Sequence, residues 1–413
     1  MSTGASERIE ATTCLVAGGG PAGMMLGFLL ARAGVDVIVA EKHADFLRDF
    51  RGDTIHPSTL EVMKELGLLE RFLERPHAET RRLAAWIGDE ELVVADFAHL
   101  PTTCRFVAFM PQWDFLDFLA AEGRRYPGFR LLMETRITGL IEEEGRVTGA
   151  RAEGPDGPVA IHAELVVGAD GRHSDIRALA GLKPVDLGAP MDVLWMRLSR
   201  RQDDPEQSLG RMDAGHMVVL INRGDYWQCA DVIPKGTYDA LRREGLDAFR
   251  RTLAALVPFL ADRVEEVSSW DEVKLLTVTV DRLERWWRPG LLCIGDAAHA
   301  MSPIGGVGIN LAVQDAIAAA NVLAEPLRRG TLADSDLATV EKRRIWPTRA
   351  TQRLQILLQN RVVAPTLARR DRPSVPAALR LLARFPMLRR IPARLIGMGF
   401  RPEHVRTAER KPA

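Results

Sequence analysis

A glycine-rich stretch near the N-terminus has the spacing of a phosphate-binding turn. It reads Gly18-Gly19-Gly20-Pro21-Ala22-Gly23, after the apolar run 13–17 and before the helix-prone run 24–33. In this spacing the first glycine permits a tight turn, the second lets the backbone approach a pyrophosphate, and the third lets a helix pack closely on a strand. Because N–H groups at a helix start face such phosphates, we assign Gly18, Gly20, Pro21, Ala22 and Gly23 to a dinucleotide site.

A carboxylate closes the next predicted strand. The apolar, β-branched run 35–40 ends at Glu41, which lies 18 residues after Gly23. An acidic side chain at this place suits the hydroxyl groups of an adenosine ribose and disfavours a ribose that carries a 2′-phosphate. We therefore add Glu41 and its neighbour Lys42 to the predicted site.

Two further turns place an aspartate after an apolar strand. They are Gly168-Ala169-Asp170-Gly171 and Gly295-Asp296, and the second leads through Pro303-Ile304-Gly305-Gly306-Val307-Gly308 to an alanine-rich helix at 310–327. A carboxylate at a strand end can hold a ribityl hydroxyl, and a helix N-terminus can stabilise negative charge on a reduced ring. Together the three turns predict a chain that wraps FAD, whereas the Asp170 turn alone is equally well explained as an ordinary β-turn.

The order of these motifs resembles that of the single-component FAD-dependent aromatic hydroxylases, the para-hydroxybenzoate hydroxylase-like flavoprotein monooxygenases. The matching motifs are GGGPAG, GADGRHSDIR and GDAAHAMSPIGGVGINLAVQDA, within residues 10–330. The expected fold class is α/β, with a Rossmann-like FAD-binding domain, an inserted and mostly antiparallel β-sheet substrate domain, and a C-terminal helical extension. We expect the FAD-binding domain at 1–75, 111–185 and 285–330, the substrate-binding domain at 76–110 and 186–284, and the helical region at 331–413.

The resemblance also implies roles for individual residues. Asp296 would bind the ribityl chain, and the backbone of Ile309 and Asn310 would contact the pyrimidine edge of the flavin. Asp170 would serve both FAD and the pyridine nucleotide. The full set of positions that resemble FAD contacts of the family is Arg51, Gln112, Asp170, Asp296, Pro303, Gly306, Gly308, Ile309 and Asn310.

The reaction that the resemblance implies has two halves. NAD(P)H reduces the flavin, and the reduced flavin reacts with O2 to give a C4a-hydroperoxide that hydroxylates an aromatic or polyketide-like small molecule. The sequence shows no second nucleotide-binding βαβ unit, so NAD(P)H would bind transiently, and the choice between NADH and NADPH stays open. Since the protein must exclude water, we expect an apolar substrate wall with Trp195, Met217, Trp227 and Pro303, although each of the first three is also explained as ordinary core.

The catalytic base is not predicted. A histidine could deprotonate a phenol, and His56, His216 and His299 are candidates, but His299 in the GDAAH turn is better explained by a structural role. Other FAD enzymes of this scaffold, a geranylgeranyl reductase or a halogenase, remain alternatives, as does a non-catalytic FAD-binding protein. The WxWxIP motif of the halogenases is absent, since Trp286-Trp287-Arg288-Pro289 does not match it.

Composition limits the remaining partners. The 413 residues have zero formal net charge, so we expect no nucleic-acid partner. The four cysteines are far apart in the sequence and form no metal-binding pattern. Isolated cysteines of this kind, together with an N-terminus that lacks an apolar segment, suit a cytoplasmic protein. We expect no metal, and either a monomer or a homodimer.

The C-terminal tail is strongly basic. Residues 361–413 hold 13 Arg and Lys against 3 Asp and Glu. Such a tail could contact an anionic lipid surface or an acidic partner, but we favour arginine-rich helices packed over the body.

Overall fold

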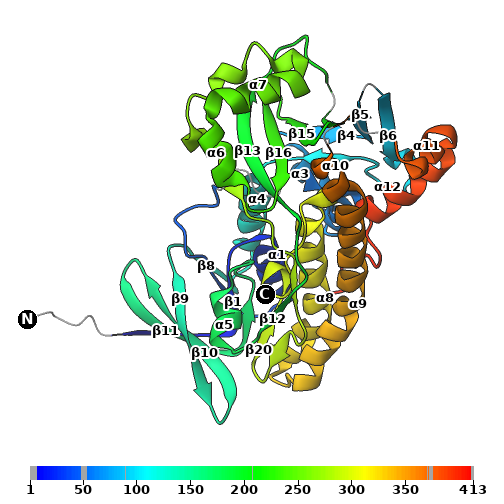
Figure 1. Ribbon diagram of the computed structural model, residues 1–413. Coiled ribbons are helices and arrows are strands. Elements are labelled where there is room, and N and C mark those ends of the chain that lie inside the picture. The colour runs from blue at the N-terminus through cyan, green and yellow to red at the C-terminus, as the bar shows by residue number, and fades with distance from the viewer. Residues whose placement is uncertain are drawn as a thin grey trace, which may run out of the picture.

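Two large sheets, two small sheets and a set of helices make up the described part of the molecule (Figure 1). The computed structural model describes residues 7–47, 54–88, 90–206, 208–369, 371 and 375–410. The first sheet runs in the order β19 (Trp287–Arg288), β20 (Leu291–Cys293), β11 (Gly157–Gly168), β1 (Arg8–Ala17), β2 (Val37–Ala40) and β8 (Phe129–Leu132). The strands from β20 to β8 are parallel, and β9 (Arg136–Glu143) and β10 (Arg146–Gly154) extend β11 as antiparallel neighbours.

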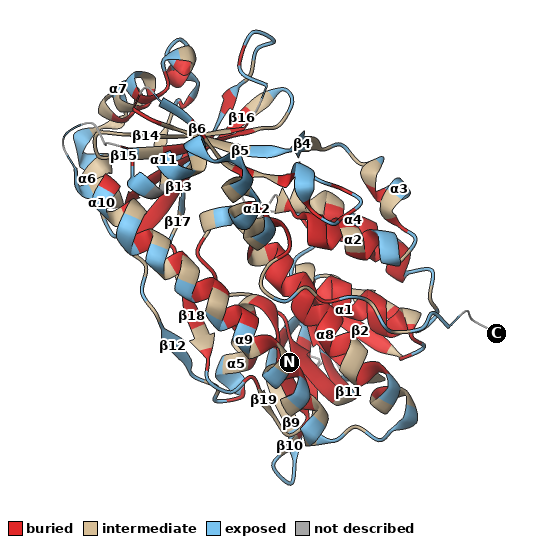
Figure 2. Cartoon of the chain, turned by 90° about the vertical axis from the view of Figure 1, so that its right-hand side faces the viewer, coloured by how far each residue is buried: buried red, intermediate tan, exposed pale blue. Residues whose placement is uncertain are grey.

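The parallel strands are buried because helices cover them. The last four residues of β1 and all of β2 are buried and apolar, as expected for strands that are covered on both faces. The covering helices include α1 (Pro21–Arg32), α4 (Gln112–Gly123) and α8 (Gly308–Arg329), and Figure 2 shows α1 and α8 as mostly buried. The segment 304–329 is long and apolar enough to cross a membrane, but most of it is enclosed by the fold, as in the core helix of a globular protein.

The second sheet contains strands from two distant parts of the chain. Its order is β17 (Lys274–Leu276), β13 (Met191–Ser199), β16 (Tyr226–Pro234), β15 (His216–Asn222), β14 (Leu209–Asp213), β5 (Arg82–Ile87) and β6 (Glu90–Asp96). All pairs except β14 with β5 are antiparallel, which confirms the expected mostly antiparallel character. Helices α6 (Tyr238–Glu244) and α7 (Leu246–Leu256) connect β16 to the segment before β17.

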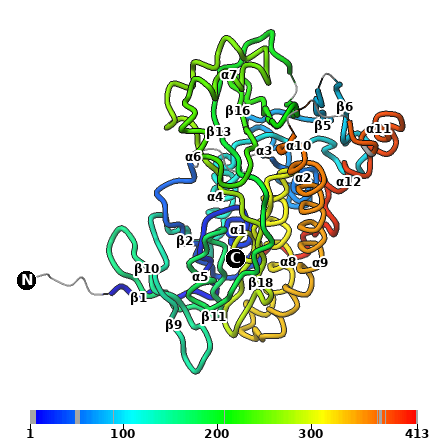
Figure 3. The backbone as a smooth tube through the Cα atoms, viewed as in Figure 1, coloured from blue at the N-terminus to red at the C-terminus, as the bar shows by residue number. Residues whose placement is uncertain are grey.

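Smaller elements join the two sheets. β3 (Thr54–Ile55), β7 (Val107–Phe109) and β4 (Ala78–Thr80) form a three-stranded sheet, and β12 (Pro184–Asp186) pairs with β18 (Asp281–Leu283). Figure 3 shows how segments far apart in the chain, blue, green and yellow, lie side by side in the first sheet. The remaining helices are α2 (Pro57–Glu65), α3 (Leu69–Leu73), α5 (Asp175–Leu179), α9 (Asp334–Leu358), α10 (Ala364–Ala368), α11 (Ala377–Arg384) and α12 (Arg390–Gly397).

Two segments differ from what their sequence pattern predicts. The pattern of residues 58–74 predicts one helix, but the structure divides it into α2 and α3, because Gly67 adopts φ +71°, a conformation that ends a helix. The pattern of residues 272–280 predicts one strand, but only the three residues of β17 pair with β13 at the sheet edge. The described residues of the C-terminal extension are largely helical up to Gly397, as expected, and residues 402–410 form a strap without helix or strand.

A buried acid lies in the middle of the second sheet. Asp231 on β16 is paired across the sheet with Leu194 and Val218, and it is 9% exposed. Burial raises the pKa of Asp231 to about 7. The folded state therefore holds this side chain in its protonated form over a pH range in which the unfolded chain is ionised.

Replacing this acid should change how stability depends on pH. Because the folded pKa of Asp231 lies above the unfolded value, folding stability falls as pH rises from the unfolded pKa toward about 7. From pH 5 to pH 8 the wild type should lose about 3 kcal/mol more unfolding free energy than Asp231→Asn, measured by urea unfolding. Asp225→Asn, at an exposed carboxylate, should follow the wild type. Parallel curves for the wild type and Asp231→Asn would show that Asp231 ionises normally in the fold.

Candidate active site

Four neighbouring strands of the first sheet end at the same level. Ala17, at the end of β1, lies opposite Ala40 of β2 and Gly168 of β11, and Gly168 lies opposite Cys293 of β20. The glycine turn, Glu41, the Asp170 turn and the Asp296 turn follow these strand ends. Cofactors of open parallel sheets bind at this edge, beyond the carboxyl ends of the strands.

The glycines of the first turn have the contacts that their predicted roles require. A Cβ atom at Gly18, where φ is +108°, would lie 2.4 Å from the carbonyl oxygen of Ala169, and one at Gly23 would lie 1.9 Å from the carbonyl oxygen of Gly18. At Gly20 the nearest atom to an added Cβ would be 4.0 Å away, so the turn is open on this side. The turn therefore has a tight inner side and an open cradle at the start of α1, which fits a bound pyrophosphate.

Glu41 fixes the second strand end to the glycine turn. Its carboxylate is 8% exposed and accepts hydrogen bonds from the backbone N–H of Gly19 at 2.8 Å and of His43 at 3.1 Å. The His43 ring also contacts it. The next residue, Lys42, is exposed. Glu41 thus has a structural role, because it holds the glycine turn, and the sequence did not indicate this role. Its contact with the adenosine ribose stays a prediction.

The carboxylate of Asp170 is directed toward its own turn. It accepts hydrogen bonds from Ser174 Oγ at 2.5 Å and from the backbone N–H of Ile176 at 3.0 Å, at the start of α5. Burial raises the pKa of Asp170, and these hydrogen bonds counteract the effect only in part. Asp170 therefore shapes the backbone beside Gly18, so any contact of this turn with a cofactor would be made by main-chain atoms.

Asp281 connects the second and third motifs. It pairs with Arg177 of α5 at 3.2 Å, and both side chains are almost fully buried. The same carboxylate accepts a hydrogen bond from the backbone N–H of Ala300 at 3.0 Å, in the loop after Asp296. The two aspartate turns are thus held in one arrangement.

A buried cluster holds the Asp296 turn on α8. Asp315, which is fully buried, accepts hydrogen bonds from the backbone N–H of Gly295 at 3.1 Å and from Arg344 Nε at 2.7 Å, and its Oδ2 lies 2.6 Å from His299 Nε2. Burial alone would raise the pKa of Asp315, but His299 and Arg344 outweigh it and hold the pKa below its ordinary value. His299 therefore has a structural position, and it is 1% exposed.

The loop before α8, which we call the flavin loop (Pro303–Gly308), is held through its backbone. Gly305 and Gly306 have φ values of +79° and +62°, which glycine adopts without strain. The carbonyl oxygen of Gly306 accepts a hydrogen bond from Thr54 Oγ1 at 2.8 Å and lies 3.0 Å from His56 Nε2. The other ring nitrogen of His56 lies 2.7 Å from the carbonyl oxygen of Ile396 in α12.

The side chain of Asn310 is also engaged inside the protein. Its Oδ1 accepts hydrogen bonds from Ser58 Oγ at 2.6 Å and Thr59 Oγ1 at 2.9 Å. Asn310 and Ile309 lie in the first turn of α8, so their backbone is placed at the helix start. Of the other predicted positions, Gln112 begins α4 and is half-buried, whereas Arg51 lies outside the described residues.

Comparison with known proteins identifies this arrangement. A family model described as an FAD binding domain matches residues 11–353. The chain belongs to this FAD-binding family. It is 35% identical to 6-methylpretetramide 4-monooxygenase of Streptomyces rimosus, over 93% of this chain and 92% of that enzyme. The chain is an FAD-dependent monooxygenase, as the motifs predicted.

More distant proteins are similar to the chain in sequence or in fold. Rifampicin monooxygenase of Streptomyces venezuelae is 29% identical over 73% of this chain, which spans 62% of that enzyme. The crystal structure of Pseudomonas aeruginosa PqsL in complex with 2-aminobenzoylacetate has a TM-score of 0.74 and 23% identity, and the match covers 87% of this chain and 99% of PqsL.

The second sheet of this flavoprotein presents an apolar face to the flavin loop. Trp195 and Met217 lie in a cluster that also includes Ile304 of the flavin loop. Val363, in the π-helical turn Gln359–Val363 after α9, and Leu367 of α10 complete the cluster, so the C-terminal helices form part of this region.

Trp227 lies on the other face of the sheet. It is fully buried beneath α7, packs against Phe259, and donates a hydrogen bond from Nε1 to Asp204 at 2.9 Å. Because neighbouring residues of a strand point to opposite faces, Gln228 and Ala230 face the flavin loop and Trp227 does not. The predicted wall of Trp195, Met217 and Trp227 is therefore not one surface, because Trp227 lies on the opposite face of the sheet.

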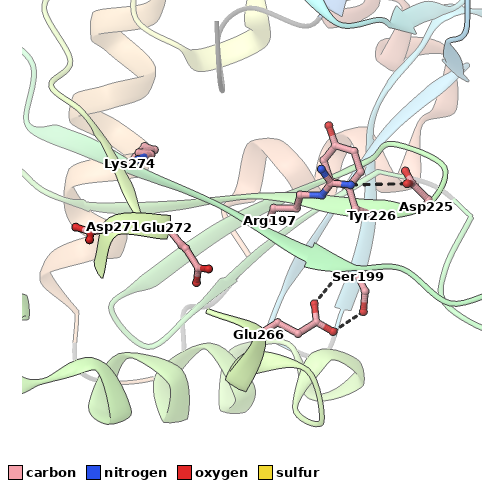
Figure 4. Close-up of a pocket in the computed structure, with 8 residues that line it drawn as sticks. All are labelled: Arg197, Ser199, Asp225, Tyr226, Glu266, Asp271, Glu272 and Lys274. Carbon is pink, nitrogen blue, oxygen red and sulfur yellow. Dashed lines mark hydrogen bonds and ion pairs between the residues drawn. The ribbon is translucent and has the colours of Figure 1, made fainter. Parts of the chain in front are cut away.

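Two hollows differ in size and in lining. An open polar hollow of about 510 Å³ is lined by Arg197, Ser199, Asp225, Tyr226, Glu266, Asp271, Glu272 and Lys274 (Figure 4). None of the motif residues lines it, and it holds four carboxylates beside two cations, so we do not assign it to the cofactor. A small apolar cavity of about 80 Å³ lies between the flavin loop, α8, α9 and α12.

Adding one methyl group to the open cradle should weaken cofactor binding without unfolding the protein. Gly20 has φ −75°, which alanine adopts freely, and no protein atom obstructs its Cβ. Gly20→Ala should raise the Kd for FAD at least tenfold, measured by fluorescence titration of the apoprotein, because the methyl group occupies the space of the phosphates. Gly139→Ala, also free of contacts, should bind FAD normally. Unchanged affinity in Gly20→Ala would contradict the pyrophosphate assignment.

Removing the charge of Asp315 should destabilise the fold. Asp315→Asn would leave the buried Arg344 with only the more distant carboxylate of Glu403, at 3.6 Å, which should cost about 3 kcal/mol of unfolding free energy and weaken FAD retention. Asp334→Asn is the matched control, because Asp334 forms a half-exposed pair with Arg146 that should contribute less than about 1 kcal/mol. Urea unfolding measures both. Equal losses in the two variants would mean that the buried cluster does not hold α8.

Proposed function

We propose that this monooxygenase hydroxylates an aromatic, polyketide-like small molecule with NAD(P)H and O2. The observation that carries the proposal is the apolar cluster that Ile304 of the flavin loop shares with Trp195 and Met217 of the second sheet. This arrangement places an apolar surface beside the loop on which the flavin ring would lie. A planar, apolar substrate is the ligand that such a surface favours.

The strand-end turns would hold FAD along one edge of the first sheet. We assign the pyrophosphate to Gly18, Gly20, Pro21, Ala22 and Gly23, and the adenosine ribose to Glu41, with Lys42, Arg51 and Gln112 nearby. Asp296 would bind the ribityl chain, and Pro303, Gly306, Gly308 and the backbone of Ile309 and Asn310 would contact the ring. When bound, FAD supplies the electrons that activate O2 for transfer of one oxygen atom to the substrate.

The protein's own part in the reaction is to orient the substrate and exclude water. Trp195, Met217 and Pro303 would contact the substrate. The start of α8 would stabilise negative charge on the ring, since N–H groups at a helix start are free and polarised. We assign no base: both ring nitrogens of His56 face backbone carbonyls, and His299 is bound to Asp315.

A polycyclic substrate is supported by the S. rimosus relative, which is named for its action on 6-methylpretetramide. Identity of 35% over nearly the whole chain supports a related ring system. The four cysteines are free and buried, which supports a reducing, cytoplasmic environment. A monomer or a homodimer remains our prediction.

Coupled turnover tests this function. The purified holoprotein should oxidise NADH or NADPH at least tenfold faster with 6-methylpretetramide or a similar polycyclic phenol than without it. One O2 should be consumed per hydroxylated product, and labelled O2 should place its isotope in that product, measured by mass spectrometry. Stimulated NAD(P)H oxidation without an oxygenated product, for every polycyclic phenol tried, would refute the proposal.

Variants on the two faces of the second sheet locate the substrate. Met217→Trp, on the face toward the flavin loop, should raise KM about tenfold because the larger side chain obstructs the apolar surface. Trp227→Phe removes the hydrogen bond to Asp204 on the opposite face, so it should lower stability and leave KM unchanged. The reverse result would place the substrate beneath α7.

A further inference from the structure

The α11–α12 projection carries exposed apolar side chains together with exposed arginines. Its exposed apolar residues are Leu381, Phe385, Met387 and Ile391, with exposed fractions of 50%, 49%, 72% and 60%. Its exposed arginines are Arg380, Arg384, Arg390 and Arg394. We call these eight residues the basic apolar face. Figure 1 shows α11 and α12 standing out from the body of the molecule.

The projection is firmly attached by its inner face. Leu379 of α11 packs near Ile87 and Leu92 of the second sheet, and Ala393 of α12 packs with Phe97 and Leu100. Arg389 donates hydrogen bonds to the carbonyl oxygens of Leu382 and Ala383 and fixes the angle between the two helices. The expectation that basic helices pack over the body is therefore correct for this inner face, and the basic apolar face is the side that remains.

All the charged Arg, Lys, Asp and Glu side chains of the segment that contains α11 and α12 are positive. Residues 372–402 contain seven arginines and no aspartate or glutamate. Among the described residues, no hydrogen bond or ion pair engages the side chains of Arg380, Arg384, Arg390 or Arg394. Their charges are thus available to an external partner, while the rest of the chain carries the compensating negative charge.

We propose that the basic apolar face docks on an anionic phospholipid bilayer. Protruding Leu, Phe, Met and Ile side chains would enter the boundary between headgroups and acyl chains, and the arginines would pair with lipid phosphates. A second copy of the chain is a poor partner, because two such faces would bring like charges together. The residues stand on a projection rather than in a groove, which suits insertion into a lipid surface.

The docking would be a peripheral contact, with the body of the protein outside the bilayer. Insertion through two short helices, with the body outside the bilayer, corresponds to a peripheral contact and leaves α8 within the core. Because the apolar and basic residues act together, binding should need both anionic lipid and intact apolar side chains, and it should weaken as salt screens the charges.

Vesicle co-sedimentation of the full-length holoprotein tests the proposal. Vesicles of phosphatidylcholine with phosphatidylglycerol should bind at least tenfold more protein than vesicles of phosphatidylcholine alone, and added NaCl should reduce the binding. Met387→Glu/Ile391→Glu and Arg384→Ala/Arg390→Ala should each lower the partition coefficient at least tenfold. FAD absorbance and circular dichroism confirm that the variants are folded, as expected for exposed positions.

Matched controls separate this face from general surface properties. Leu179→Glu/Val185→Glu exchanges two exposed apolar residues elsewhere, and Arg243→Ala/Arg251→Ala removes two exposed arginines near α7, so both should bind vesicles like the wild type. Equal binding to both vesicle types, or full binding by Met387→Glu/Ile391→Glu, would overturn the proposal. Binding to soluble polyglutamate but to neither vesicle would also overturn it and would assign the face to an acidic protein.

Discussion

The buried carboxylate of Asp315 is the constraint on which the active-site geometry depends. Three separate parts of the chain meet at it: the Asp296 turn through Gly295 and His299, the long helix α9 through Arg344, and α8, which carries Asp315 itself. An isolated charge at this depth would be strongly unfavourable, so the partners must be present together. Glu403 of the C-terminal strap extends the cluster, because it is buried and pairs with both Arg343 and Arg344. The position of the Asp296 turn relative to α8 and α9 is therefore set by charges buried inside the protein.

A second principle follows from the contacts around the motifs. The polar side chains that the motifs supply are mostly turned inward: Asp170 onto its own turn, Asn310 onto α2, and Glu41 onto the glycine turn. Backbone N–H groups and helix starts are thereby left for the cofactor. A site of this kind can be rigid, because each backbone segment is held by a buried side-chain hydrogen bond instead of by the ligand.

The difference between backbone groups that face the cofactor and side chains that hold the backbone explains which parts of the site could be predicted from the sequence. Glycine positions report local backbone requirements, so the turn at Gly18 and Gly20 and the parallel strands around it were recognisable. Asp315 and Arg344 were missed because they are 29 residues apart and meet only through the packing of α8 on α9. A charged residue within the apolar, alanine-rich run 310–327 was the available signal. Trp227 was grouped with Trp195 and Met217 although it lies on the opposite face, because strand alternation defines two faces without telling which one meets the flavin loop.

His56 shows how the C-terminal extension is linked to the flavin loop. Its two ring nitrogens face the carbonyl oxygens of Ile396 and Gly306, and both contacts can be hydrogen bonds only if the ring carries two protons. Burial lowers the pKa of His56, which favours the neutral ring with a single N–H. The carbonyl oxygen of Gly306 already accepts a hydrogen bond from Thr54. The carbonyl oxygen of Ile396 lies in the last turn of α12, where helix carbonyl groups have no hydrogen-bond donor within the helix. The single proton is therefore better placed toward α12, so that Thr54 remains the side-chain donor to the carbonyl oxygen of Gly306.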